Sequence, residues 1–274
     1  MKSAKIIAIA NQKGGVGKTT TAYNLGYGLS DAGQRVLLVD FDPQANLSMC
    51  FGIERPDELE FSMHEMLSTA IACEPIPYES GIYHHNRNEN EKVSSLDIIP
   101  SNINLSATEI NLRNEVGGER TLAELLEPLR VEYDYIVIDT NPYLGMLTIN
   151  ALAACDDVII PVSPQLWSAN GLADLIGTIF KVKRKINPCI NMSGILLTLC
   201  DERTLLFKNA KALLEESYGD KIKIFNTFIP NTVRVGEANY GSLSVLEYDP
   251  TGKASIAYKA FVKEVMNNGI QENY

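Results

Sequence analysis

Short apolar runs recur along the chain, and most of them lack the alternation of polar and apolar residues that marks a half-exposed strand. Continuous runs rich in Val, Ile and Leu are typical of parallel strands that are buried on both faces. The predicted strands span residues 5–10, 35–40, 96–100, 133–139, 157–162 and 190–199, with a further one at 221–229. A sheet of such strands needs a layer of helices on each side.

The stretches between these runs have helical periodicity. They predict helices at residues 18–32, 120–131, 168–186, 203–217 and 254–267. Alternating strands and helices indicate right-handed crossover connections. We therefore expect an α/β fold, a doubly wound and mostly parallel sheet with helices on both faces, in a single domain over residues 1–274.

Residues 71–95 interrupt this pattern, because they are rich in polar and turn-forming residues. We expect a long excursion on the surface. A linker between two domains is the alternative, and the strand pattern that resumes after residue 95 disfavours it. Within the excursion, His84 and His85 are expected to be a solvated pair.

The charge balance limits the class of partner. Lys plus Arg is 24 and Asp plus Glu is 34, so the net charge is −10. This argues against a protein coated in positive charge for nucleic acid, but it allows a local basic patch.

The five cysteines are scattered without a CxxC pair, and there are three histidines, which disfavours disulfides and Cys- or His-built metal sites. No apolar run reaches the length of a membrane span and no signal peptide is evident. We expect a cytoplasmic protein without membrane contact.

The strongest motif is NQKGGVGKTTT, residues 11–21, which follows the first predicted strand and opens the first predicted helix. Gly14, Gly15 and Gly17 allow a tight turn whose N–H groups point inward. The start of the helix adds the positive end of its dipole. The segment therefore predicts a cradle for phosphate groups.

Two side chains of this segment are expected to bind a nucleoside triphosphate and its magnesium ion. Lys18 is expected to contact the β- and γ-phosphates, and the Thr19 hydroxyl to bind Mg²⁺. Gln12 stands where the usual G-x-x-x-x-G-K-[ST] motif has its first glycine, and Lys13 is an additional lysine ahead of the glycines.

Carboxylates follow two of the predicted strands, where open α/β sheets place their ligands. Asp40 ends the second strand and Asp42 lies just beyond it, and Asp139 ends another apolar run. Since Asp40 and Asp42 are two residues apart, we expect both to point to one side. Asp139 is in the position of a magnesium-side aspartate.

These motifs resemble those of the ParA family of partition ATPases, in the larger class that also contains MinD and the nitrogenase iron protein. KGGVGKTT is similar to the deviant Walker A motif, VLLVDFDPQANLS to the second family motif and IVIDTNPYLG to the magnesium-site motif. The segment from Ile229 to Phe261 resembles the adenine-side loop and last helix of the family. Four motifs occur in the family's order over nearly the whole chain.

The resemblance implies a slow, Mg²⁺-dependent ATPase that forms a homodimer with ATP sandwiched at the interface. Lys13 would contact the opposing nucleotide, Lys18 the bound one, and Asp42 would orient the attacking water. The implied metal-site residues are Thr19, Asp42 and Asp139. The implied nucleotide-binding residues are Lys13, Gly14, Gly15, Val16, Gly17, Lys18, Thr19, Thr20, Pro230 and Asn231.

The family also implies DNA binding without sequence specificity and a ParB-like partner protein, hence association with the nucleoid when ATP is bound. The residues expected to contact DNA are Arg203, Arg234, Lys208 and Lys211. Lys208 and Lys211 are expected on one helix with Arg203, and the basic run KVKRK at 181–185 could supplement them. Since only a few residues precede the first predicted strand, we do not expect an operator-binding domain or autoregulation by specific DNA binding.

Two alternatives stay open. A MinD-like protein without DNA binding would carry a membrane-binding amphipathic helix at its carboxyl end. The last predicted helix contains Phe261, Val262 and Val265 but ends polar, so packing of this helix on the core is the preferred interpretation. A nucleotide-gated interaction module with very little turnover is the non-enzymatic alternative.

Overall fold

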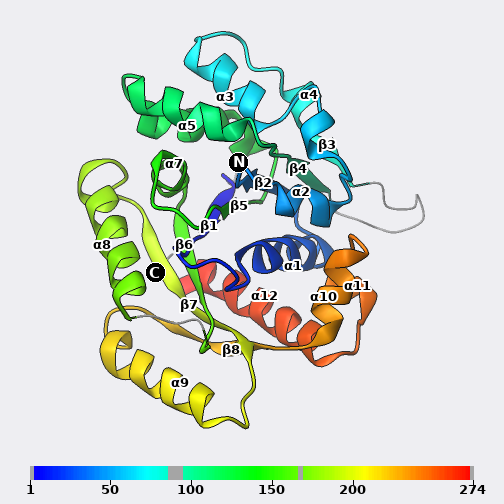
Figure 1. Ribbon diagram of the computed structural model, residues 1–274, viewed down its shortest axis with the longest axis vertical. Coiled ribbons are helices and arrows are strands. Elements are labelled where there is room, and N and C mark those ends of the chain that lie inside the picture. The colour runs from blue at the N-terminus through cyan, green and yellow to red at the C-terminus, as the bar shows by residue number, and fades with distance from the viewer. Residues whose placement is uncertain (1–2, 86–94, 166–168, 272–274) are drawn as a thin grey trace.

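The computed structural model describes residues 3–85, 95–165 and 169–271, and these form an eight-stranded sheet between two layers of helices (Figure 1). The strand order is β3-β4-β2-β5-β1-β6-β7-β8, and all neighbours are parallel except β3 with β4. The strands are β1 (Lys5–Ile9), β2 (Val36–Phe41), β3 (Tyr83–His84), β4 (Leu96–Ile99), β5 (Tyr135–Thr140), β6 (Asp157–Val162), β7 (Asn191–Cys200) and β8 (Ile224–Pro230). The predicted fold class is confirmed.

The sheet is buried on both faces because its side chains alternate between two apolar cores. Ile6 and Ala8 of β1 belong to one core, and Ile7 and Ile9 belong to the other. Both cores contain Val, Ile and Leu from the neighbouring strands, which explains why the strands read as continuous apolar runs.

Helices from different parts of the chain cover each face (Figure 1). One face carries α1 (Lys18–Asp31), α2 (Asn46–Phe51), α10 (Val233–Tyr240), α11 (Val245–Tyr248) and α12 (Lys253–Gln271). The other carries α3 (Met63–Ile71), α5 (Leu105–Asn114), α6 (Thr121–Leu126), α7 (Met146–Ala154), α8 (Ala169–Lys185) and α9 (Leu205–Tyr218).

The helix predicted at 120–131 is divided into two. It consists of α6 and a 3₁₀ helix, η3 (Glu127–Val131), with Pro128 at the start of the second piece. Proline lacks an N–H and crowds the preceding turn, so the α-helix cannot continue through it.

The polar excursion carries more structure than expected. Its first part contains α4 (Tyr78–Gly81) and the edge strand β3, while residues 86–94 lie outside the described residues. The expectation of a solvated histidine pair is confirmed for His84, whose side chain is 73% exposed, but not for His85, which is half-buried. Nδ1 of His84 lies 2.7 Å from Oδ1 of Asp97, and the ring of His85 meets Phe51 edge-on at 5.2 Å between centroids.

The last helix packs on the core, as preferred from the sequence. Phe261, Val262 and Val265 of α12 are all buried, and Phe261 meets Phe225 of β8 edge-on. Among the described residues, no helix combines the length and the apolar character that crossing a bilayer would need.

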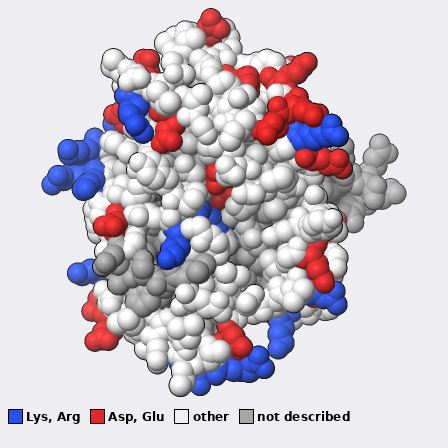
Figure 2. Space-filling model, in the orientation of Figure 1, with Lys and Arg blue, Asp and Glu red and all other residues white. Residues whose placement is uncertain are grey.

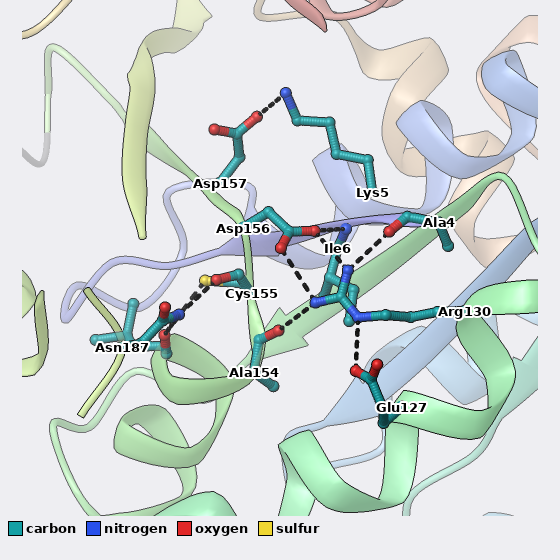
Figure 3. Close-up of polar contacts among 11 residues, drawn as sticks. Ala4, Lys5, Ile6, Glu127, Arg130, Ala154, Cys155, Asp156, Asp157 and Asn187 are labelled. Atoms are coloured by element: carbon teal, nitrogen blue, oxygen red, sulfur yellow. Dashed lines mark hydrogen bonds and ion pairs between the residues drawn. The ribbon is translucent and has the colours of Figure 1, made fainter. Parts of the chain in front are cut away.

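Arg130 joins several segments at the amino-terminal edge of the sheet (Figure 3). Its guanidinium donates hydrogen bonds to the carbonyl oxygens of Ala4 and Ala154 at 2.8 and 3.4 Å. It also pairs with both carboxylate oxygens of Asp156, at 2.9 and 3.1 Å. Asp156 in turn accepts the N–H of Ile6 at 2.8 Å, so one arginine fixes the starts of β1 and β6 relative to η3.

We predict that Arg130→Ala destabilises the fold by about 2 kcal/mol, because it leaves Asp156 and two carbonyl groups without their partner. Urea unfolding measures the loss. Arg55→Ala is the matched control, since Arg55 pairs with Glu58 where both side chains are exposed, and it should be nearly silent. Equal losses in the two variants would contradict the prediction.

Candidate functional site

The glycine-rich loop joins β1 to α1 at the carboxyl edge of the sheet. Gly15 and Gly17 have φ angles of 73° and 82°, which lie in the left-handed region that favours glycine. Gly17 is also the N-cap of α1, so the N–H groups of the first turn of this helix are directed into the loop. The predicted anion cradle is therefore present in the backbone.

Two side chains that the sequence analysis missed hold this loop in place. Asn11 donates to the carbonyl of Pro161 at 2.6 Å and accepts the N–H of Lys13 at 2.9 Å. Thr198, near the end of β7, donates to the carbonyl of Val16 at 2.7 Å. Asn11 stands directly ahead of the loop and could have been suspected, but the contact of Thr198 across 182 residues is purely tertiary.

The loop opens into a cleft of about 880 Å³. Its walls come from the loop, from the segment after β2 and from α10. The lining includes Gly14, Gly15, Gly17, Lys18, Thr19, Thr20, Asp42, Cys50, Pro142, Leu199, Asn239 and Tyr240. Most of the predicted phosphate and metal residues are thus brought to one cavity.

Lys18 is buried at the base of this cleft, with Nζ 3.2 Å from the carbonyl oxygen of Lys13. Burial lowers the pKa of the Lys18 ammonium, while the carboxylates of Asp139 and Asp42 act in the opposite direction. A cation held in this way lacks solvation and gains from an anionic ligand.

Asp139 has no exposed surface, and neither of its oxygens makes a hydrogen bond of standard geometry within the described part of the chain. Burial, followed by the charge of Asp40, raises the pKa of Asp139 well above its ordinary value, although Thr19 and Lys18 lower it. A buried carboxylate with unused oxygens is costly unless something pairs with it.

A magnesium ion fits this set of residues. The Thr19 hydroxyl and the carboxylates of Asp42 and Asp139 supply oxygen atoms, the donors that Mg²⁺ prefers. Across residues 3–85, 95–165 and 169–271, no three His, Cys, Asp or Glu side chains form a metal-binding cluster. Mg²⁺ typically takes one or two carboxylates together with phosphate oxygens and water, so it needs no such cluster.

Asp40 and Asp42 are two residues apart but lie in different surroundings. Asp42 lines the cleft and accepts the N–H of Gln44 at 3.0 Å. Asp40 is fully buried and accepts both the N–H and the hydroxyl of Ser48, at 2.8 and 2.7 Å. Burial raises the pKa of Asp40 to about 7. Asp40 therefore anchors α2, and of the two aspartates only Asp42 lines the cleft.

Lys13 differs from Lys18 in its surroundings. It is exposed, and its ammonium has no hydrogen-bond or ion-pair partner among the residues that the structure describes. It is also absent from the lining of the cleft. Within the described parts of its own subunit, the charge of Lys13 is therefore not engaged.

A smaller pocket of about 280 Å³ adjoins the cleft, and the predicted residues Pro230 and Asn231 line it. Leu199 and Asn239, which the sequence analysis missed, belong to both cavities. Leu199 has a φ angle of 54°, a rare value for a residue with a side chain and one that often marks functional sites. No sequence signal identifies it.

The two predicted DNA-contacting arginines follow neighbouring strands. Cys200 at the end of β7 is paired with Pro230 at the end of β8, and Arg203 and Arg234 come three and four residues later. Both side chains are exposed, and each forms an ion pair with a nearby acid, Asp201 at 3.0 Å and Glu237 at 2.9 Å.

The helix expected to carry Arg203 begins after it, because Thr204 is the N-cap of α9. Lys208 and Lys211 are on α9, three residues apart and so on one side of it. The basic run 181–185 ends α8, which leads back to the start of β7, so it lies at the amino-terminal edge of the sheet. The expectation that it supplements the arginines is wrong.

Comparisons with known proteins match nearly the whole chain. A family model described as an AAA domain matches residues 4–192. Sporulation initiation inhibitor protein Soj of Bacillus subtilis is 39% identical over 265 residues, 97% of this chain and 99% of Soj. Chromosome partitioning protein ParA of Myxococcus xanthus is 38% identical over 263 residues, 96% of this chain and 88% of that protein.

A solved structure extends the similarity to three dimensions. Cobyrinic acid a,c-diamide synthase of Mycobacterium smegmatis, with a bound ATP analogue and magnesium, is 30% identical and has a TM-score of 0.82. The match covers 98% of this chain and 97% of the other. The similarity therefore extends over nearly the whole fold.

The raised pKa of Asp40 gives a testable dependence of stability on pH. The folded chain binds this proton more tightly than the unfolded chain, so the contribution of Asp40 to the free energy of unfolding falls as the pH rises from about 4 to about 7. Asp40→Asn cannot titrate. Its stability relative to the wild type should therefore rise by about 2–3 kcal/mol between pH 5 and pH 8 in urea unfolding. A difference that does not change with pH would contradict this.

Proposed function

The chain belongs to the ParA family of partition ATPases, and from this premise we propose that it is an ATP-dependent dimerising ATPase that binds DNA without sequence specificity. We further propose a ParB-like partner, in plasmid, chromosome or mobile-element partition. The observation that carries the proposal is the buried pair of Lys18 and Asp139 beneath the glycine-rich loop.

The nucleotide is proposed to bind with its phosphates in the loop and its base in the smaller pocket. Lys18 and the N–H groups at the start of α1 would bind the phosphates, and Pro230 and Asn231 would contact the base. Thr19, Asp42 and Asp139 would hold Mg²⁺, which neutralises phosphate charge when bound.

The residues of the cleft suit phosphoryl transfer to water. Lys18, already deprived of solvent, would stabilise negative charge on the transferred phosphate without prior reorganisation. Asp42 lies at the wall of the cleft, where its carboxylate would accept a hydrogen bond from the attacking water. Its backbone is fixed by the hydrogen bond of its N–H to Asp40, 3.2 Å long.

Dimerisation is proposed to engage Lys13. This lysine is exposed beside the cleft and its ammonium has no partner in the described parts of its own subunit. In a face-to-face dimer, it would meet the phosphates bound by the second copy, where poor solvation strengthens the attraction.

DNA binding is proposed for the carboxyl ends of β7 and β8. Arg203 and Arg234 are exposed there, and Lys208 extends the positive surface along α9. Figure 2 shows basic side chains at the bottom of the view, to the right of α9, whereas acidic side chains gather at the upper right, near α3 and α4. The net negative charge thus leaves room for a local basic edge.

A positioning or interaction ATPase without DNA binding is the alternative. A MinD-like version would need an exposed apolar face on the last helix, but Phe261, Val262 and Val265 are buried. We therefore favour DNA, and propose that the protein is cytoplasmic and associates with the nucleoid when ATP is bound.

We predict that Lys13→Ala abolishes ATP-dependent dimers in light scattering while ATP still binds. Losing one charge from a desolvated interface costs about 2–5 kcal/mol of association free energy. Lys221→Ala, at another exposed lysine, is the control and should dimerise normally. Unchanged dimerisation of Lys13→Ala would sink the proposal for this residue.

We predict that the wild type with ATP binds random duplexes with a strong dependence on salt. Arg203→Ala and Arg234→Ala should each weaken binding equally for every sequence and reduce the salt slope by about one unit. Arg184→Ala, at the opposite edge of the sheet, should behave like the wild type. Wild-type binding that ignores salt, or that requires one sequence, would contradict non-specific DNA binding and favour an operator-specific or non-DNA role.

A further inference from the structure

The loop that follows Asp139 connects the end of β5 to the start of α7, and it is held at both ends. At its start, Thr140 donates to the carbonyl of Ile9 at 2.9 Å, which ties it to β1. Pro142, within the loop, lines the cleft. The position of the loop is therefore coupled to the geometry of the nucleotide site proposed above.

The far end of the loop lacks a local cap. Gly145 is the N-cap of α7 and has no side chain that could accept the N–H groups of the first turn. Instead, Oε1 of Glu109 accepts the N–H of Met146 at 2.8 Å. Glu109 belongs to α5, 37 residues earlier in the chain, so the cap comes from another element of the fold.

The fit between Glu109 and Gly145 is close. A Cβ atom at Gly145 would overlap Oε1 of Glu109 and would also crowd the ring of Tyr143. The Glu109 side chain is 17% exposed, and its carboxylate lies at the positive end of the helix dipole of α7. Hydrogen bonds from a backbone N–H to a carboxylate are among the stronger ones in proteins.

Two further contacts join the loop to the first turn of α7. The Thr148 hydroxyl, in the first turn of α7, lies 3.0 Å from Oδ1 of Asn141 and 2.6 Å from the carbonyl oxygen of Tyr143. Since Thr148 moves with α7, displacement of this helix would displace the loop next to Asp139. The cap that Glu109 provides is thus connected to the loop through α7 and Thr148.

We infer that Glu109 is a positioning residue for ATP hydrolysis, which holds the loop after Asp139 in its productive place by capping α7. The inference rests on the proposed ATPase activity. Glu109 is not among the described residues that line the cleft, and it accepts its hydrogen bond from Met146 instead. Loss of the cap should therefore affect the chemical step more than nucleotide binding.

Two measurements on Glu109→Ala test the inference. Hydrogen–deuterium exchange of the Met146 amide should accelerate by at least about tenfold, because its acceptor is removed. The kcat for ATP should fall by about tenfold to a hundredfold, as for other small misplacements of catalytic groups, with KM changed by less than about threefold. Glu109→Gln keeps an oxygen acceptor, so it should retain most of the exchange protection of the Met146 amide and most of kcat.

Two further variants separate positioning from general stability. Gly145→Ala displaces the carboxylate and also crowds the ring of Tyr143, so it should reproduce the loss of kcat expected for Glu109→Ala. Glu65→Ala removes another carboxylate cap, which accepts the N–H of Ser62 at 2.8 Å at the start of α3. Glu65→Ala should lower the thermal midpoint of unfolding about as much as Glu109→Ala does, and it should leave kcat unchanged.

The outcomes of these measurements decide separately whether Glu109 caps α7 and whether it positions the loop. Unchanged exchange in Glu109→Ala would overturn the cap, and faster exchange with an unchanged kcat would overturn the positioning role. An equal loss of kcat in Glu65→Ala would reduce Glu109 to a structural residue. A wild type that binds ATP but never hydrolyses it would refute the proposed ATPase and the positioning role, while the exchange data would still decide whether Glu109 caps α7.

Discussion

Lys18 and Asp139 bring opposite charges into a region where neither is solvated, and much of the surrounding structure serves to hold them there. Asp139 comes from the middle of the sheet, where β5 lies between β1 and β2, so its backbone cannot adjust without moving three strands. Lys18 begins α1, whose N-cap is the left-handed Gly17. Burying these groups is costly even though their charges partly compensate each other, and a ligand that supplies further charge and hydrogen bonds would offset more of that cost, which supports the cleft as a binding site.

Acidic and basic residues of the remaining surface are concentrated in different segments of the chain. Between residues 43 and 85 the chain has seven Asp or Glu residues and one Arg, and these residues build the flank of α3 and α4. Between residues 200 and 211, from the end of β7 into α9, it has three Lys or Arg residues against two Asp or Glu. An overall charge of −10 is thus compatible with a basic edge, because the acidic residues are concentrated elsewhere.

Much of the fold could be predicted from the sequence. The continuous apolar runs identify β1, β2 and β4–β8, since strands buried on both faces carry a strong local signal. The helices that were missed, such as α2, α7 and α11, are short, and nine residues or fewer give little periodicity to detect. The two-residue strand β3 exists only because β4 offers a free edge for it to pair with.

The sequence alone determined the phosphate loop and its strand-end aspartates, because glycine spacing and a carboxylate after a buried strand are local properties of the chain. Only the tertiary structure could decide that Asp40 turns to Ser48 while Asp42 faces the cleft, since both conform to the same pattern. The same holds for Thr198 on the loop and Glu109 on α7, whose contacts span 182 and 37 residues. A side chain's role depends on which distant backbone groups reach it, and no spacing in the sequence encodes that distance.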